Sequence, residues 1–358
     1  MIGLWRVKPP EGFGHSRKDT PTMDANRMPD GLEPASDEDV GRPKSLSEFN
    51  GQSAAKENLS VFIDAARRLG RPLDHVLFSG PPGVGKTTLS QIMASELGVG
   101  FRTVAAPAIE KPADIVSVLA GMAARDVLFI DEIHRLPAKV EEVLYSAMED
   151  FRLDVIIGEP GQGRPVSIPL EPFTLVGATT RPGNLSAPLR DRFGIPVRLE
   201  LYTDAEMEMV VRRASLLLSL EMSEEAVSEL AKRSRGTPRI GLRLLRRVRD
   251  FAVSAGRSTV SAEDADAALL RLGVDREGLD DADRRYVSVL RDRFRGGPVG
   301  LSTLASAMGE SPDTIEHSLE PFLIRKGIVD RTPRGRMLCG KHAPARMRHG
   351  VLQDSLPF

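Results

Sequence analysis

The first half of the chain alternates apolar runs with helical stripes. An amphipathic helix is predicted over residues 47–69, where apolar side chains recur at helical spacing: Leu59, Phe62, Ile63, Ala66 and Leu69. A second helix is predicted over residues 87–97, and Gly98 ends it. Three short runs that are apolar almost throughout predict buried strands, over residues 75–78, 127–130 and 173–178. Strands that alternate with helices are typical of a parallel sheet with helices on both faces.

In the second half, helical stripes follow one another. From residue 203 to 272 the pattern predicts four helices and no strands, and the stripe of the first helix includes Leu217. Thr237 before Pro238 predicts the start of the third helix, and Ser261 with Asp264 predicts the cap of the fourth. The remainder predicts three short helices and a hairpin over residues 328–338, which is the layout of a winged helix.

These patterns divide the chain into five regions. We expect a mostly disordered tail over residues 1–41, because it has few periodic apolar residues to offset its ordering entropy. The others are an α/β domain, a small all-helical domain, a winged-helix domain and a C-terminal tail, over residues 42–202, 203–274, 275–340 and 341–358.

Composition restricts the class of protein. No apolar run approaches the ~20 residues that a membrane span needs, and the N-terminus lacks the core of a signal peptide, so we expect a cytoplasmic protein. The single cysteine, Cys339, excludes a disulfide framework within one chain. The net charge is -1, yet Asp330 is the only acid among eight basic residues over residues 321–350. This basic segment is either a nucleic-acid footprint or a solvated tail.

The motif Gly80-Pro81-Pro82-Gly83-Val84-Gly85-Lys86-Thr87 is a P-loop between a predicted strand and a predicted helix. Glycines let backbone N–H groups turn toward phosphates; Lys86 would reach the β- and γ-phosphates, and Thr87 would ligate Mg²⁺.

Two acids, Asp131 and Glu132, follow the second apolar strand. At the carboxyl end of that strand, Asp131 can hold the hydration shell of the magnesium ion and Glu132 can polarise the attacking water. The two motifs together predict ATP hydrolysis.

The acid pair with a trailing helical domain marks the AAA+ class of ring ATPases, and within it the chain resembles the RuvB family. The resemblance runs from Arg42 to Leu338 and rests on strings such as GPPGVGKTT (80–88), VLFIDEIHRL (127–136), GATTR (177–181), PLRDRFGI (188–195), RGTPR (235–239) and RTPRGR (331–336). It implies an AAA+ parallel sheet, a helical lid and a winged helix. One departure is Gly41, where the family usually has leucine.

The resemblance also implies roles for single residues. Thr180, or its neighbour Thr179, would sense the γ-phosphate, and Arg192 would be an arginine finger that reaches the adjacent subunit's site. Residues expected to border the nucleotide are Arg42, Gly83, Gly85, Thr88, Glu149, Asp150, Phe151, Tyr202 and Arg239.

Partners follow from the same resemblance. A hairpin over residues 153–170, with Val166 and Ile168 on one face, would dock on RuvA, and Arg331 and Arg336 would contact DNA on the wing. The implied function is a ring motor, a hexamer in the family, that translocates double-stranded DNA at Holliday junctions with RuvA and the resolvase RuvC.

Other functions remain open at this point: a clamp loader or replication initiator, a protein unfoldase, or an adaptor with an inactive site. An unfoldase would need an exposed aromatic pore loop, for which no convincing segment exists, and Lys86, Asp131 and Glu132 oppose an inactive site.

Overall fold

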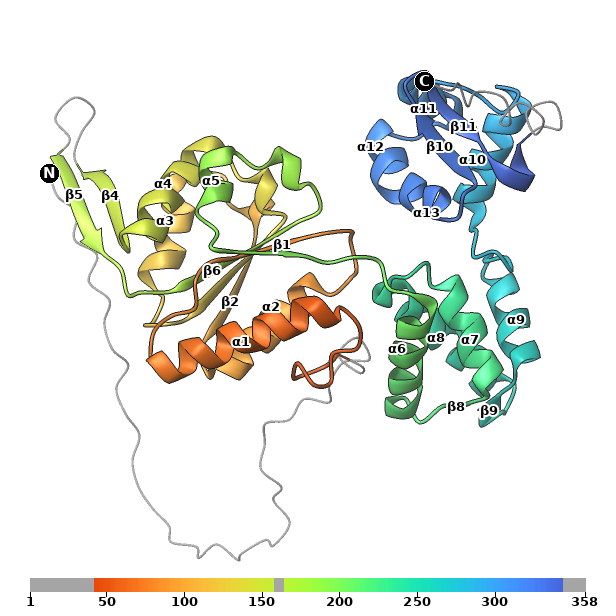
Figure 1. Cartoon of the computed structure of the whole chain (residues 1–358), viewed down its shortest axis with the longest axis horizontal. Helices are drawn as coiled ribbons and strands as arrows, with labels where there is room; N and C mark the ends of the chain where they lie inside the picture. The colour runs from red at the N-terminus through yellow and green to blue at the C-terminus, as the bar shows by residue number, and fades with distance from the viewer. Residues whose placement is uncertain (1–41, 158–163, 344–358) are drawn as a thin grey trace, which may run out of the picture. The chain divides into compact units, whose positions relative to one another are not determined.

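A computed structural model describes residues 42–157 and 164–343. The predicted tails, residues 1–41 and most of 341–358, therefore lie outside the described residues. The N-terminal part of the fold contains a parallel five-stranded sheet with the strand order β2-β3-β6-β1-β7 (Figure 1). The bounds of these strands are β1 Val76–Ser79, β2 Phe101–Ala105, β3 Val127–Asp131, β6 Thr174–Thr179 and β7 Ile195–Arg198.

Helices cover both faces of this sheet, as Figure 1 shows, which confirms the predicted fold class. Successive residues of a strand point to opposite faces. Accordingly, Val76 and Phe78 pack in the core with α1 (Ser53–Leu69) and α2 (Lys86–Leu97), whereas Leu77 packs in a separate core with α3 (Pro112–Ala120) and α4 (Ala138–Glu149). Burial on both faces explains why the central strands are continuous apolar runs.

The first helix differs from its prediction in two ways. It begins at Ser53 rather than near residue 47, because Gly51 and Gln52 adopt left-handed backbone angles that a helix cannot continue through. Its buried residues are Leu59, Ile63 and Ala66, whereas Phe62 and Leu69 are exposed at the edge of the stripe.

The sequence pattern missed both edge strands of the sheet. β2 is largely exposed or half-buried, and β7 alternates between buried and exposed residues, so neither forms a continuous apolar run. The predicted hairpin is present as β4 (Arg152–Ile157) and β5 (Arg164–Pro169), which pair antiparallel. Short helical segments complete this part: α5 Ala187–Asp191, η1 Ala106–Ala108, η2 Ile133–Arg135 and η3 Pro182–Asn184.

The following region is a lid of four helices, α6 Asp204–Leu217, α7 Glu224–Arg233, α8 Pro238–Ser254 and α9 Ala262–Arg271. Pro238 opens α8, and Ser261 and Asp264 form a capping box on α9, as predicted. The expectation of no strands is wrong, because Glu221–Met222 (β8) and Thr259–Val260 (β9) pair briefly between helices. Leu217 is half exposed, since it lies at the end of α6 away from the core.

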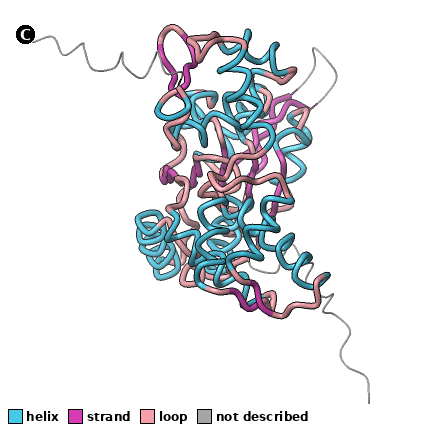
Figure 2. The backbone as a smooth tube through the Cα atoms, turned by 90° about the vertical axis from the view of Figure 1, so that its right-hand side faces the viewer, coloured by secondary structure: helices cyan, strands magenta, loops and turns pink. Residues whose placement is uncertain are grey.

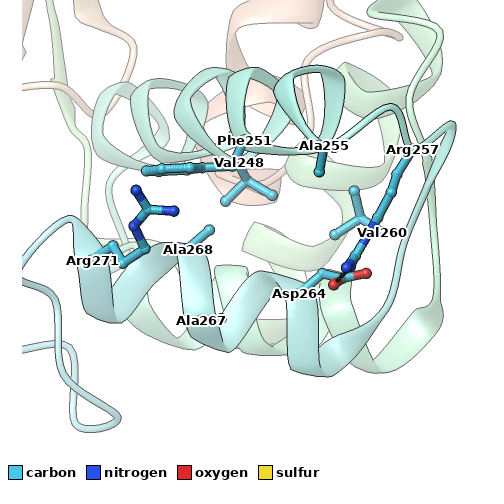
Figure 3. Close-up of a pocket in the computed structure, with 10 residues that line it drawn as sticks. Val248, Phe251, Ala255, Arg257, Val260, Asp264, Ala267, Ala268 and Arg271 are labelled. Atoms are coloured by element: carbon cyan, nitrogen blue, oxygen red, sulfur yellow. Dashed lines mark ion pairs between the residues drawn. The ribbon is translucent and has the colours of Figure 1, made fainter.

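A pocket of about 150 Å³ lies between α8 and α9 (Figure 3). Arg271 lies over the ring of Phe251 at one end, 4.5 Å from its centroid, and Arg257 pairs with Asp264 at the other. Its lining comes entirely from the lid and contains no residue of the nucleotide motifs.

The last region is a winged helix, with α10 Asp281–Asp292, α11 Leu301–Met308, α12 Pro312–Thr314, η4 Ile315–Leu319 and α13 Glu320–Arg325, followed by the strands β10 Val329–Thr332 and β11 Gly335–Leu338 and by η5 Gly340–His342. Figure 2 shows the strands in magenta among the cyan helices. The third predicted helix is a succession of α, π and α turns, because Pro321 has no N–H to donate and interrupts the regular pattern. No helix in the described parts of the chain is long and apolar enough to cross a membrane.

Candidate functional site

The predicted chemistry gathers at one edge of the sheet. β1, β6 and β3 are neighbouring parallel strands, so their carboxyl ends lie together. The P-loop follows β1, Asp131 and Glu132 end β3, and Thr179 ends β6. The Gly80 N–H donates to the Thr179 carbonyl at 3.2 Å, which ties the P-loop to the end of β6.

The P-loop needs its glycines for backbone conformation and for space. Gly80, Gly83 and Gly85 have φ angles of 145°, 78° and 106°, which L side chains rarely adopt. A Cβ at Gly80 would lie 2.2 Å from the Leu199 carbonyl oxygen, so any other residue there would displace the backbone directly after β7. The loop leads directly into α2, and the free backbone N–H groups at the N-terminus of that helix favour phosphate binding.

Lys86 is buried at the first position of α2. Its ammonium group donates to the carbonyl oxygens of Gly80 and Pro81, both at 2.8 Å. Burial lowers the pKa of Lys86 to about 8, and the charges of Glu132 and Asp131 oppose that shift. The lysine is thus held inside its own loop, close to both acids.

Glu132 is held by Thr180, the residue directly after β6. Its carboxylate accepts the Thr180 hydroxyl at 3.2 Å and the Thr180 N–H at 3.4 Å, and its own backbone is left-handed with a φ of 50°. The Glu132 N–H donates to Asp131 Oδ1 at 3.0 Å. Between the two threonines that the sequence left as alternatives, Thr180 is the one whose side chain touches Glu132.

His134 completes this cluster, although no sequence motif assigned it a role. Its Nδ1 lies 3.0 Å from the Thr179 hydroxyl and 3.2 Å from Glu132 Oε2. Burial is the main reason that the pKa of His134 is lowered, with Glu132 opposing the shift. The residue stands two positions after Glu132 in η2, so its proximity in sequence was the available signal.

Residues from other segments border the P-loop. Tyr202 is buried, its hydroxyl donates to the Val84 carbonyl at 3.2 Å, and burial raises its pKa. The Arg239 N–H, in the first turn of α8, donates to the Gly83 carbonyl at 3.4 Å. From the segment before α1, the Phe49 ring would lie 2.9 Å from a Cβ at Gly85, whereas Arg42 is exposed at the start of that segment.

Arg192, the expected arginine finger, belongs to a different group of residues. It caps the end of α5, and its guanidinium lies 4.5 Å over the Tyr145 ring of α4. Its Nη2 pairs with Glu149 at 3.0 Å, and its Nη1 donates to the Pro188 carbonyl at 2.8 Å. Its Nε is buried without a hydrogen-bond partner among the described residues. We call Arg192, Tyr145 and Glu149 the finger cluster.

Hydrogen bonds behind the Tyr145 ring hold it in place. The Tyr145 hydroxyl lies 3.2 Å from the Ser186 hydroxyl and 3.3 Å from Glu141, and the Ser186 side chain caps the start of α5. Two more of the residues expected beside the nucleotide, Asp150 and Phe151, are also at this end of α4. Asp150 pairs with Arg152 at 3.2 Å, and the Phe151 ring packs against Phe173.

The hairpin and the wing hold the remaining expected residues. Val166 on β5 is exposed, but Ile168 is half-buried and packs against the core under α4, so they do not form one exposed apolar surface. Arg331 and Arg336 are directly opposite each other on β10 and β11, and both pair with glutamates of the preceding helices.

A P-loop, an acid pair on a nearby parallel strand and a helical lid define an AAA+ ATPase, here joined to a winged helix. Family models match all three parts: the Holliday junction DNA helicase RuvB P-loop domain at residues 41–199, the RuvB AAA lid domain at 202–275 and the RuvB C-terminal winged helix domain at 276–343. The chain belongs to the RuvB family. It is therefore a P-loop ATPase and a branch-migration motor subunit, rather than a clamp loader, initiator, unfoldase or inactive adaptor.

Individual relatives agree with the family models. The Holliday junction branch migration complex subunit RuvB of Paramagnetospirillum magneticum is 59% identical over 297 residues, which are 83% of this chain and 86% of that protein. The structure of the Thermotoga maritima RuvB Holliday junction branch migration motor is 43% identical, with a TM-score of 0.77, over 89% of this chain and all of the other. A proline-to-glycine point mutant of that motor has a TM-score of 0.78 at the same identity, over 88% of this chain and all of the other.

Proposed function

We propose that the chain assembles as a ring, a hexamer as in the family resemblance, and uses ATP to translocate double-stranded DNA at Holliday junctions. RuvA would be its direct partner and RuvC would act on the same junctions, in the cytoplasm. One observation carries the ring: Arg192 is held by Tyr145, Glu149 and the Pro188 carbonyl, not by the P-loop of its own chain. An arginine finger placed in this way requires a neighbour's nucleotide.

Within one chain, each residue of the nucleotide site has a distinct task. Lys86 would exchange its loop carbonyls for the β- and γ-phosphates, and Glu132 would orient the attacking water. Thr180, already bonded to Glu132, would report the γ-phosphate to it. Residues that would surround the rest of the nucleotide are Arg42, Gly83, Gly85, Thr88, Tyr202 and Arg239. From the neighbouring subunit, Arg192 would be joined by Glu149, Asp150 and Phe151.

The donor set at the phosphate end suits Mg²⁺. Thr87 offers a hydroxyl in the first turn of α2, and Asp131 offers a carboxylate at the end of β3. Magnesium prefers oxygen ligands and keeps several waters, so one or two protein donors with the phosphates are sufficient. The bound ion would neutralise charge on the phosphates, while Asp131 and Thr87 hold it in register with Lys86.

The hairpin of β4 and β5 would dock on RuvA through Val166. An exposed valine on a projecting hairpin suits an apolar contact, and Ile168 would support it from the core side. At the other end of the chain, Arg331 and Arg336 would bind DNA phosphates. Phosphate contacts carry no sequence information, which suits a motor that moves along any sequence.

A junction-dissociation assay tests this function. We expect the chain to separate a synthetic Holliday junction into duplexes when ATP, Mg²⁺ and RuvA are present, and much more slowly without RuvA. Lys86→Ala should abolish the reaction while the junction is still bound, because the lysine serves the nucleotide and not the DNA. ATP-independent dissociation, or a rate that ignores RuvA, would contradict the proposal.

A further inference from the structure

The two wing arginines face each other in an arrangement that should be unfavourable. Arg331 and Arg336 are a directly opposed cross-strand pair on the hairpin. Like charges in such a pair destabilise a hairpin. The structure resolves the conflict with carboxylates from η4 and α13, and Figure 1 shows α13 in the same domain as β10 and β11, with α13 in contact with β10.

Glu320 is the centre of this arrangement. Its side chain is fully buried, and its two oxygens accept the Nε–H groups of Arg331 at 2.6 Å and of Arg336 at 2.9 Å. The Tyr286 hydroxyl of α10 adds a third hydrogen bond at 3.1 Å. A buried carboxylate is unfavourable unless it is paired and hydrogen-bonded, and here both oxygens are. Glu320 therefore holds both guanidinium groups, in each case through the Nε atom of the arginine.

Glu316 lies one turn earlier, nearer the surface. Its Oε1 is 3.4 Å from Arg331 Nη1 and from Arg336 Nη2, and its backbone carbonyl accepts Arg331 Nη2 at 2.8 Å. A guanidinium has five N–H groups, so the Nε contact uses one and directs the terminal nitrogens away from the buried acid. The Arg331 side chain keeps 39% of its surface exposed.

We infer that Glu320, assisted by Glu316, is a positioning residue that holds the wing arginines ready for phosphate. This inference rests on the proposed DNA contact of Arg331 and Arg336 and explains how the contact is prepared. A long arginine side chain loses rotamer freedom when it binds, and a stem that is already fixed loses less. The four groups carry two positive and two negative charges, so the benefit lies in orientation and not in net charge.

The direction in which DNA affinity changes when a carboxylate is removed distinguishes positioning of the arginines from neutralisation of their charge. Removing a carboxylate makes the wing more positive, which by electrostatics alone should tighten DNA binding. If the carboxylate positions the arginines, its removal should weaken binding instead. Glu320→Gln suits the test, because the amide keeps one acceptor oxygen but presents N–H groups to the second arginine.

The experiment is a salt titration of duplex binding by the full chain, on two duplexes of unrelated sequence. For Glu320→Gln we expect affinity to fall roughly tenfold, as for one lost charged hydrogen bond, and the slope of log affinity against log salt to fall by about 0.9 per lost phosphate contact. Glu316→Gln should change affinity in the same direction by less, because its contacts are longer. Asp292→Asn removes an exposed acid of the same domain and gives the purely electrostatic baseline.

Two further variants keep the outcomes distinct. Arg331→Ala/Arg336→Ala should weaken binding equally on both duplexes and reduce the slope by roughly two. If that double variant binds like the wild type, the proposed DNA contact fails and the inference fails with it. If the double variant is weak but Glu320→Gln and Glu316→Gln bind as tightly as the baseline or tighter, only the positioning role is overturned. Should Glu320→Gln unfold, the half-exposed Glu316→Gln decides alone by the sign of its effect.

Discussion

In the ATPase domain, the basic side chains of Lys86 and Arg192 are held in contrasting ways. Lys86 is buried among backbone carbonyls of its own loop, at the same sheet edge as Asp131 and Glu132. Arg192 lies on an aromatic ring and a carboxylate, with one nitrogen buried and unpaired among the described residues. One chain thus brings together the P-loop and the acid pair, whereas Arg192 lies in a separate cluster, as the proposed action on a neighbour's nucleotide requires.

The largest loss of activity is expected when Arg192 is removed, and mixing with subunits that lack Lys86 tests whether the two residues act across subunits. Arg192→Ala should lower ATP hydrolysis by ~10³–10⁵, the contribution of an arginine finger in related phosphoryl transfer. Mixed with Lys86→Ala subunits, it should recover part of the activity, because some interfaces regain both groups. Steady-state hydrolysis is measured across mixing ratios, with co-assembly verified by differently tagged subunits. No recovery in co-assembled mixtures would place Arg192 in its own chain's site.

The next variant distinguishes ATP binding from ATP hydrolysis at the site formed by the P-loop and the acid pair. Glu132→Gln should lower turnover by roughly 10²–10⁴, the usual contribution of a positioned acid or base, yet keep ATP binding. Lys86→Ala is the matched comparison and should weaken binding itself, because the ammonium is proposed to contact phosphate. Equilibrium binding of a fluorescent ATP analogue and single-turnover hydrolysis report the two effects. Near-normal turnover by Glu132→Gln would falsify its role.

A third variant changes the hairpin of β4 and β5, away from the nucleotide site and the finger cluster. Val166→Asp should weaken RuvA binding roughly a hundredfold, because an unpaired carboxylate buried in an apolar contact costs several kcal/mol. Ile168 is left unchanged because it packs against the core, so its replacement would disturb the fold. Val253→Asp places the same charge on another exposed valine, on α8, and should leave RuvA binding intact. Binding is followed by calorimetry; equal losses for both variants would mean a general charge effect.

A more modest loss is expected from the finger cluster, where Tyr145 supports Arg192. Tyr145→Leu should lower kcat for ATP about tenfold without raising KM, since a partly desolvated cation–π contact contributes up to ~2 kcal/mol and nucleotide binding uses other residues. Tyr145→Phe keeps the ring and should remain close to wild type. In mixed rings the defect should follow the subunit that donates Arg192. A rise in KM alone would show that Tyr145 serves nucleotide binding.

Local motifs were readable from sequence because their geometry is local. The P-loop and the acid pair need only a strand, a loop and the next helix, and the apolar runs before Gly80 and Asp131 mark those strands. Edge strands were missed for the opposite reason, because solvent on one side removes the continuous apolar signal. The exposed Leu69 and Leu217 show that a stripe predicts a face, but not how far the partner helix covers it.

Contacts between distant segments could not be predicted. Tyr145 and Arg192 are 47 positions apart and meet only because α4 and α5 pack together. On the wing, the basic segment counted from residue 321 begins one position after Glu320, the acid that pairs with both arginines. Charge counted along the chain therefore described a basic segment, whereas charge counted in space describes a neutral cluster in which Arg331 is the more exposed arginine.

Tyr202 links the P-loop to the turn between α7 and α8 of the lid by two hydrogen bonds. Its hydroxyl donates to the Val84 carbonyl, and its backbone N–H donates to the Gly236 carbonyl at 2.8 Å. A movement of the lid that breaks one of these bonds must change the free energy of the P-loop conformation. Thermodynamic linkage is reciprocal, so whatever factor nucleotide applies to the lid equilibrium, the lid equilibrium applies to nucleotide affinity. One tyrosine residue, through its side chain and its backbone, thus couples the P-loop and the lid in both directions.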